Sequence, residues 1–137
     1  MIEGNGVQFV KTDQAPAPAG HYSQATVGNG LAFVSGQLPV DKEGNARPDV
    51  SFEEQTRLAV GNMLAVLTAA GAKPEQLMRV TAYIVGVENW PRFNSVYADL
   101  LPQVKPARTV VPVAELHHGC LVEIDAIAIL PTNQASR

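Results

Sequence analysis

The chain has 137 residues, which suits one compact domain because a protein of this size rarely builds two independent cores. Hydrophobic residues make up 46% and charged residues 17%, outside the range of disordered chains. The net charge of −3, without a run of Lys or Arg, argues against nucleic acid as a partner. No apolar stretch is long enough to span a membrane and no secretory signal begins the chain, so we expect a cytoplasmic protein with no membrane partner.

The first predicted elements form a β-hairpin. Residues 15–20 are Pro-rich and must be extended, which makes them a connection. Residues 21–27 and 31–35 then flank Gly28-Asn29-Gly30, a turn suited to joining two antiparallel strands.

A long helix follows. Ser51 and Glu54 match the capping box, in which a hydroxyl and a carboxylate satisfy backbone donors at a helix start. Apolar residues then recur at helical spacing, which is typical of a core-facing stripe, and Gly71 can adopt the left-handed conformation that ends many helices.

The second half predicts strand, helix, strand, strand. Residues 77–85 are rich in β-formers, and Asn89-Trp90-Pro91 opens a second amphipathic helix. Residues 109–113 and 120–130 predict two strands around a turn at His117-His118-Gly119, before a frayed tail at 131–137. This order predicts a single domain, residues 1–137, of the α+β class with both helices on one face of the sheet.

Two carboxylates interrupt an apolar face of the last strand. Period-two alternation places Val122 and Ile124 on one face, and Glu123 and Asp125 on the other among apolar neighbours. Because an unpaired buried carboxylate is costly, at least one should meet a cation, a ligand or a subunit boundary. A solvated strand face or a structural ion pair is an equal alternative.

Arg108 is the natural cation to consider. Its planar fork can hold a carboxylate through two parallel hydrogen bonds, which lysine does less well. An isolated arginine after Pro-Ala is nevertheless more often a surface residue, and spacing alone leaves both interpretations open.

Several motifs occur together in one order: GHYSQ at residues 20–24, VSGQLP at 34–39, FNSVY at 93–97, PART at 106–109 and VEIDAIA at 122–128. In this order they resemble the RidA/YjgF family over nearly the whole chain. The resemblance implies a chorismate-mutase-like α+β fold with a mixed sheet, and a homotrimer with its sites in the clefts between subunits. It also implies cofactor-independent hydrolysis of reactive enamine and imine acids, such as 2-aminoacrylate, to 2-oxo acids and ammonia.

The resemblance also assigns roles to residues of this chain. Arg108 matches the arginine that grips the substrate carboxylate, Glu123 the acid that handles the hydrolytic water, and Tyr22 the tyrosine that closes the site. The residues matched to the lining of the site are Ser35, Gly36 and Asn94, together with Val110. Each has a structural alternative: Tyr22 can pack its ring at the surface, and Ser35-Gly36 can end a strand in a tight turn.

Two positions depart from the family pattern. Val110 stands where many members carry cysteine, which removes thiol chemistry there, and His21 replaces a common proline. Rival functions are therefore kept open: a deaminase for a larger, 2-aminomuconate-like acid, a ligand-binding or chaperone-like protein, and last a ribonuclease, which lacks a basic patch here.

The remaining reactive residue types predict structure rather than chemistry. Cys120, the single cysteine, is expected to be a buried small hydrophobe. His117 and His118 are adjacent, and on an extended chain they would point to opposite sides and not share a metal ion. A solvated turn is the expectation for both, and no metal site is predicted.

Overall fold

A computed structural model describes residues 6–131 and shows an α+β fold with a six-stranded sheet. The elements in chain order are β1 (Gln8–Val10), β2 (Ala25–Gly28), β3 (Leu31–Gln37), α1 (Phe52–Ala69), β4 (Leu77–Val85), α2 (Trp90–Leu100), β5 (Ala107–Val113) and β6 (Val122–Ile129). Short 3₁₀ turns lie at Pro74–Gln76, Val87–Asn89 and His117–Gly119. The expected frayed tail lies outside the described residues, apart from Pro131.

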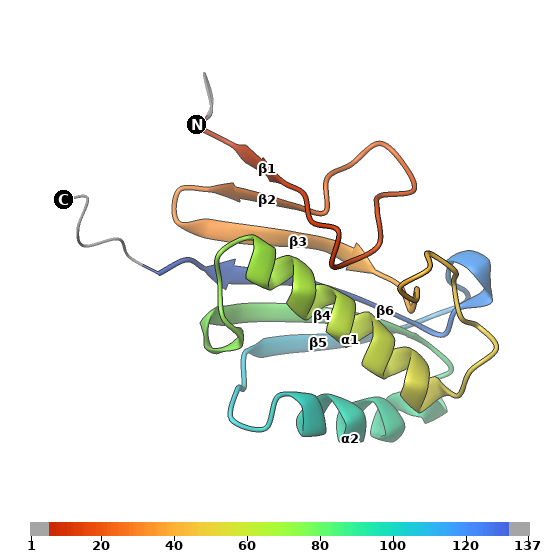
Figure 1. The fold of residues 1–137 in the computed structure, drawn as a ribbon. Helices are drawn as coiled ribbons and strands as arrows, with labels where there is room; N and C mark the ends of the chain where they lie inside the picture. The colour runs from red at the N-terminus through yellow and green to blue at the C-terminus, as the bar shows by residue number, and fades with distance from the viewer. Residues whose placement is uncertain (1–5, 132–137) are drawn as a thin grey trace.

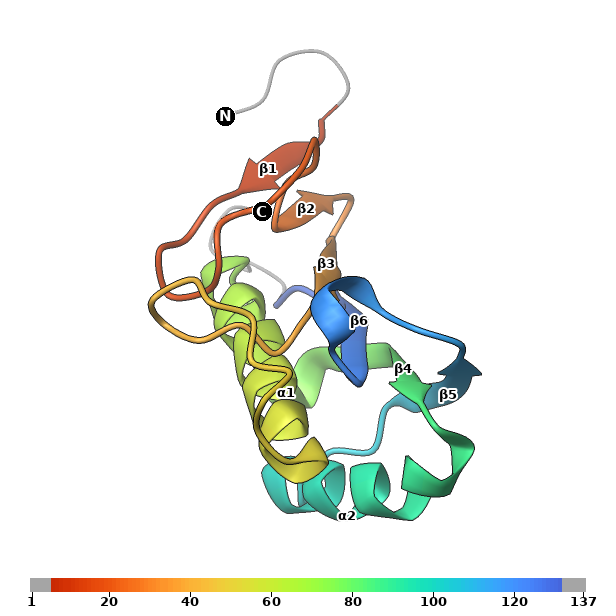
Figure 2. The same cartoon turned by 90° about the vertical axis from the view of Figure 1, so that its right-hand side faces the viewer.

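The sheet is mixed. Its strand order is β1-β2-β3-β6-β4-β5, in which β4 and β5 are parallel and every other neighbouring pair is antiparallel. Both helices lie on the same face of the sheet, and α1 packs across β3 and β6 and against α2 (Figures 1 and 2). The predicted class and the placement of the helices are therefore confirmed.

Local signals set the limits of the hairpin and of the first helix. Asn29 and Gly30 join β2 to β3 with φ of 52° and 78°, as a two-residue type I′ turn requires. Ser51 Oγ accepts the Glu54 N–H at 3.1 Å, while the Glu54 carboxylate pairs with Arg57 instead of completing a capping box. At the other end Gly71 has φ 98°, and its N–H donates to the Thr68 carbonyl in a Schellman motif.

The core lies between the helices and one face of the sheet. Val80, Ala82 and Ile84 of β4 alternate with less buried residues, and all three are fully buried. Val122 and Ile124 of β6 behave in the same way. Within residues 6–131 no α-helix covers the opposite face, which we call the open face of the sheet. Apolar side chains are exposed there, including Phe33 at 44% and Ile129 at 49%.

The structure differs from the sequence prediction in several local details. The first hairpin strand begins at Ala25 rather than residue 21, because Gly20 and Tyr22 form a turn through a backbone hydrogen bond. Asn89 does not cap α2; its amide donates to the Val85 carbonyl. The edge strand β1, three residues long, was not predicted. Among the described residues, no helix is long and apolar enough to cross a membrane.

Candidate functional site

Arg108 projects from β5 onto the helix-covered face. Its register partner in β4 is Val80, which belongs to the core, and its guanidinium lies against α2. Arg108 Nη1 donates to Asn94 Oδ1 at 3.0 Å. The guanidinium carbon lies over three rings of α2, at 5.4 Å from the centroid of Trp90, 5.8 Å from Phe93 and 4.9 Å from Tyr97.

These contacts fix the guanidinium and leave donors for a ligand. Aromatic faces attract a cation and restrict its position, and the Asn94 bond orients the plane of the fork. Within residues 6–131, Asn94 is the one side chain to which Arg108 donates a hydrogen bond, out of five guanidinium N–H groups. The arrangement suits a carboxylate approaching the free edge of the fork.

Tyr97 adds a feature that the sequence did not predict. Its ring stacks on Phe93 with centroids 5.4 Å apart, and its hydroxyl is buried without a hydrogen-bond partner in the described part of the chain. Burial raises the pKa of the hydroxyl, and the positive charge of Arg108 opposes that rise. Tyr97 therefore stays neutral beside the cation.

Glu123 lies on the other face of the sheet, against a bulge in β3. Val34 pairs with Ala126 and Gln37 with Ile124, so Ser35 and Gly36 together oppose a single residue of β6. A Cβ at Gly36 would collide with Glu123 Oε2 and would lie 3.1 Å from its Cδ. The absence of a side chain at Gly36 makes room for this carboxylate. The expected strand end at Ser35 is corrected, because both residues lie within β3.

The Glu123 carboxylate also borders a pocket of about 500 Å³, together with residues 115–119 and Leu38. Burial raises the pKa of Glu123, the negative charge of Asp125 raises it further, and His117 lowers it. Asp125 shows the same behaviour: burial raises its pKa, while a hydrogen bond from the Tyr83 hydroxyl at 3.2 Å and the charge of Arg79 oppose the rise. Both carboxylates are thus easier to protonate than ordinary ones.

Ser35 connects this region to the segment that carries Tyr22. The Ser35 hydroxyl donates to the Ser23 carbonyl at 2.6 Å, one residue after Tyr22. Tyr22 itself is 52% exposed, and its hydroxyl accepts the Ala19 N–H at 3.4 Å. Its ring is free to contact a ligand or a neighbouring subunit.

The predicted site residues therefore fall into two groups. One, the anchor group, comprises Arg108 and Asn94; Val110 lies on the same face of β5 and packs against the core. The other, the water group, comprises Glu123, Gly36, Ser35 and the neighbouring Tyr22.

The two groups lie on opposite faces of the sheet. In the sheet register Arg108 pairs with Val80 of β4, and Glu123 pairs with Tyr83 of the same strand. These two partners are three residues apart, so Arg108 and Glu123 are also offset by about 10 Å along the strand direction. No ion pair joins Arg108 to Glu123 or Asp125 within residues 6–131. Arg108 is therefore not the partner of these carboxylates within the same chain.

The other reactive side chains behave largely as expected. Cys120 is buried, which confirms the prediction, and burial raises the pKa of its thiol. His117 and His118 lie in an exposed turn, also as predicted. Their expected opposite orientation is wrong: the rings stack with centroids 4.7 Å apart, because His118 adopts φ 60° rather than an extended conformation. No cluster of three metal-ligating side chains occurs among the described residues.

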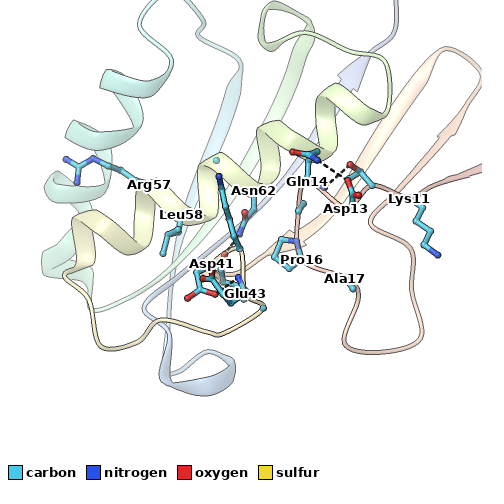
Figure 3. Close-up of a pocket in the computed structure, with 16 residues that line it drawn as sticks. Lys11, Asp13, Gln14, Pro16, Ala17, Asp41, Glu43, Arg57, Leu58 and Asn62 are labelled. Carbon is cyan, nitrogen blue, oxygen red and sulfur yellow. Dashed lines mark hydrogen bonds between the residues drawn. The ribbon is translucent and has the colours of Figure 1, made fainter.

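A second, larger pocket of about 790 Å³ lies on the outer side of α1 (Figure 3). Residues 11–17, residues 40–44 and one side of α1, including Gly61 and Asn62, line it. Asn62 donates to the carbonyls of Leu38 and Val40 at 3.1 and 2.9 Å and so fixes one wall. None of the predicted site residues lines this pocket, and no sequence motif predicts it.

Comparison with known proteins identifies the family. The family model described as Endoribonuclease L-PSP matches residues 12–130. The chain belongs to the RidA/YjgF family. A RutC family protein of Pyrococcus horikoshii is 36% identical over 121 residues, an alignment that covers 88% of this chain and 96% of that protein.

Two further relatives of this RidA/YjgF chain carry more specific names. The chloroplastic Reactive Intermediate Deaminase A of Arabidopsis thaliana is 35% identical over 123 residues, covering 90% of this chain and 66% of that protein. The crystal structure of Escherichia coli TdcF with bound serine superposes with a TM-score of 0.83 and 30% identity, covering 90% of this chain and 99% of the other.

Sequence reasoning missed the residues that surround the two principal side chains. The spacing of Trp90, Phe93 and Tyr97 by three and four residues predicts one apolar side of a helix, but it also marks a row able to contact one cation. Tyr83 carried no signal, because its role depends on its register with β6.

Proposed function

We propose that this RidA/YjgF protein hydrolyses enamine and imine acids of the 2-aminoacrylate type to 2-oxo acids and ammonia, without a cofactor. The observation that carries the proposal is the Arg108 guanidinium, which Asn94 and three aromatic rings fix while most of its N–H donors have no partner among residues 6–131. Such a fork holds a planar carboxylate in one orientation. The deaminase name of the Arabidopsis relative and the serine, itself an amino acid, bound to TdcF support the proposal.

Under this proposal the active form is a homotrimer whose sites lie between subunits. Because Arg108 and Glu123 occupy opposite faces, a complete site combines the anchor group of one subunit with the water group of its neighbour. The uncovered apolar residues of the open face, such as Phe33 and Ile129, favour such association.

The chemistry asks only for orientation and proton transfer. Arg108 holds the carboxylate and thereby fixes the adjacent protonated imine, whose carbon is electrophilic. A water molecule forms a C–O bond to this carbon as one of its protons moves to the Glu123 carboxylate, which gives a neutral carbinolamine. Glu123 then returns the proton to the nitrogen. The C–N bond breaks with its electron pair on nitrogen, the hydroxyl proton follows, and a 2-oxo acid and an ammonium ion result.

Ammonia release from freshly generated 2-aminoacrylate tests the proposal. We expect R108A to lose most of the acceleration, on the order of 10²-fold, because charge-assisted hydrogen bonds to the carboxylate disappear. R108K should restore only part of it. The matched control is R57A, since Arg57 is an exposed helix residue that pairs with Glu54. Wild-type-like rates in R108A would remove the anchor role.

The substrate panel separates the alternatives. No acceleration with any enamine or imine acid, combined with saturable binding of a 2-oxo acid, would identify a ligand-binding protein instead. Activity confined to larger dicarboxylic acids would identify the 2-aminomuconate-like specialist. Because the matching family model is described as an endoribonuclease, RNA is included as a substrate; RNA cleavage that is lost in E123Q would refute the deaminase assignment.

A further inference from the structure

Three titratable side chains gather on the open face beside the bulge of β3. Tyr83 of β4 lies directly opposite Glu123 of β6 in the sheet register. The Tyr83 hydroxyl donates to Asp125 Oδ2 at 3.2 Å. Tyr83 therefore lies opposite Glu123 but forms a diagonal hydrogen bond to Asp125 on the same face of the sheet. Glu123 and Asp125 are two residues apart on one strand face, a spacing of about 7 Å.

These carboxylates stand close to one another without a neutralising partner. Both are partly buried, and neither takes part in an ion pair with another side chain of residues 6–131. At this separation two negative charges repel each other appreciably, and partial burial strengthens the repulsion.

The remaining charged groups near them are few. His117 from the turn before β6 faces Glu123, and Arg79 of β4 faces Asp125 and Tyr83. Glu115 and His118 line the same pocket as Glu123, and Gly36 of β3, which carries no charge, lies against the Glu123 carboxylate. The Tyr83 hydroxyl bonds one carboxylate of the pair, Asp125. That bond favours the charged form of Asp125 and so leaves the proton to Glu123.

We propose that Asp125, held by the Tyr83 hydroxyl, is a positioning residue that keeps Glu123 able both to accept and to return a proton during the reaction. This inference rests on the proposed function of the site. Water addition requires the Glu123 carboxylate and ammonia departure requires its protonated form, so the residue works best when both forms are accessible near the working pH. Removal of the Asp125 charge lowers the pKa of Glu123, although burial still raises that pKa above its ordinary value.

The pH dependence of kcat/KM for ammonia release tests the inference. In D125N the acidic limb of the profile, which reports Glu123 in the free enzyme, should move to lower pH by about 0.5–1.5 units. D125E retains the charge and should leave the limb in place. Y83F frees Asp125 to take the proton first, so it should shift the limb in the same direction by a smaller amount.

The matched control is D99N, which removes an exposed carboxylate from α2 and should change neither the rate nor the limb. A uniformly slower D125N with an unmoved limb would show a merely structural role and overturn the inference. To separate this outcome from failure of the proposed function, the Glu123 carboxyl is also titrated by ¹³C NMR without substrate. A titration midpoint that is the same in D125N and in the wild type overturns the inference even if the protein is inactive.

Discussion

Substitution of Gly36 by alanine tests the geometry of the water group most directly. The backbone at Gly36 lies outside the left-handed region, so alanine is tolerated there by the main chain. The new Cβ would nevertheless collide with Glu123 Oε2, and it would lie 3.1 Å from Cδ and 3.4 Å from Cγ of the same side chain. The three nearest heavy atoms all belong to Glu123, so the substitution acts first on that side chain.

The expected magnitudes for stability and activity differ. Overpacking a tight site costs about 1–3 kcal/mol, and the flexible end of Glu123 can swing away, so we expect about 1 kcal/mol. For a chain of this length that lowers Tm by about 3–5 °C. Displacement of the carboxylate by about 1 Å is more serious for catalysis, because misplacement of this size can cost on the order of 10²-fold in rate.

Thermal unfolding and ammonia release measure the two effects. The control is Gly61 to alanine in α1, where the added Cβ meets nothing within 4 Å and should stabilise the helix by about 0.5–1 kcal/mol without changing the rate. In an E123A background the carboxylate is absent, so Gly36 to alanine should cost almost no stability. An equal cost in both backgrounds, or a wild-type rate in the single variant, would refute the placement of Glu123 against the bulge.

Three further outcomes follow from the contacts described above. N94A should lower kcat/KM about 10-fold or more, mainly through KM, because Arg108 loses the hydrogen bond that orients it; steady-state kinetics will show it. Burial holds the pKa of Glu123 above its ordinary 4.5, so ionisation destabilises the fold as pH rises through that pKa; E123Q should therefore gain Tm over the wild type at pH 8 and lose this gain at pH 4. Arg92 lowers the pKa of Glu53 to about 2 from 4.5, so their pairing stabilises the fold above pH 4.5 and ceases to do so as pH falls through about 2; the Tm difference between E53Q and the wild type should vanish over that window.

Much of the fold could be predicted because the ends of its helices and strands depend on local chemistry. Asn29-Gly30 supplies the positive φ angles of a type I′ turn, and Ser51 and Gly71 mark the two ends of α1 within one residue or two. Period-two alternation also separated Glu123 correctly from the core-facing Val122 and Ile124. In each case the signal lies within a few residues of the feature.

The parts that escaped prediction depend on contacts between distant segments. The bulge at Ser35-Gly36 is defined only by its pairing with β6, and the face occupied by Arg108 only by the register of β5 on β4. The position of Trp90 over Arg108 likewise depends on how α2 packs against β5. Motif order predicts the site residues as one set, yet it gives no information on which faces of the sheet they occupy.

The opposite placement of Arg108 and Glu123 leads to a complementation experiment. If a site combines Arg108 of one subunit with Glu123 of the next, each single variant, R108A or E123Q, is inactive by itself. Trimers assembled at random from an equal mixture contain sites in which both residues are intact.

Such a site requires an R108A subunit to supply Glu123 and an E123Q subunit to supply Arg108. This pairing occurs at about one quarter of the sites in a cyclic trimer. We therefore expect ammonia release at about a quarter of the wild-type rate after co-refolding, and none when R108A is mixed with the double variant. A site contained within one chain predicts no recovery in either mixture, so an inactive first mixture would refute the shared site while leaving the roles of the two residues unchanged.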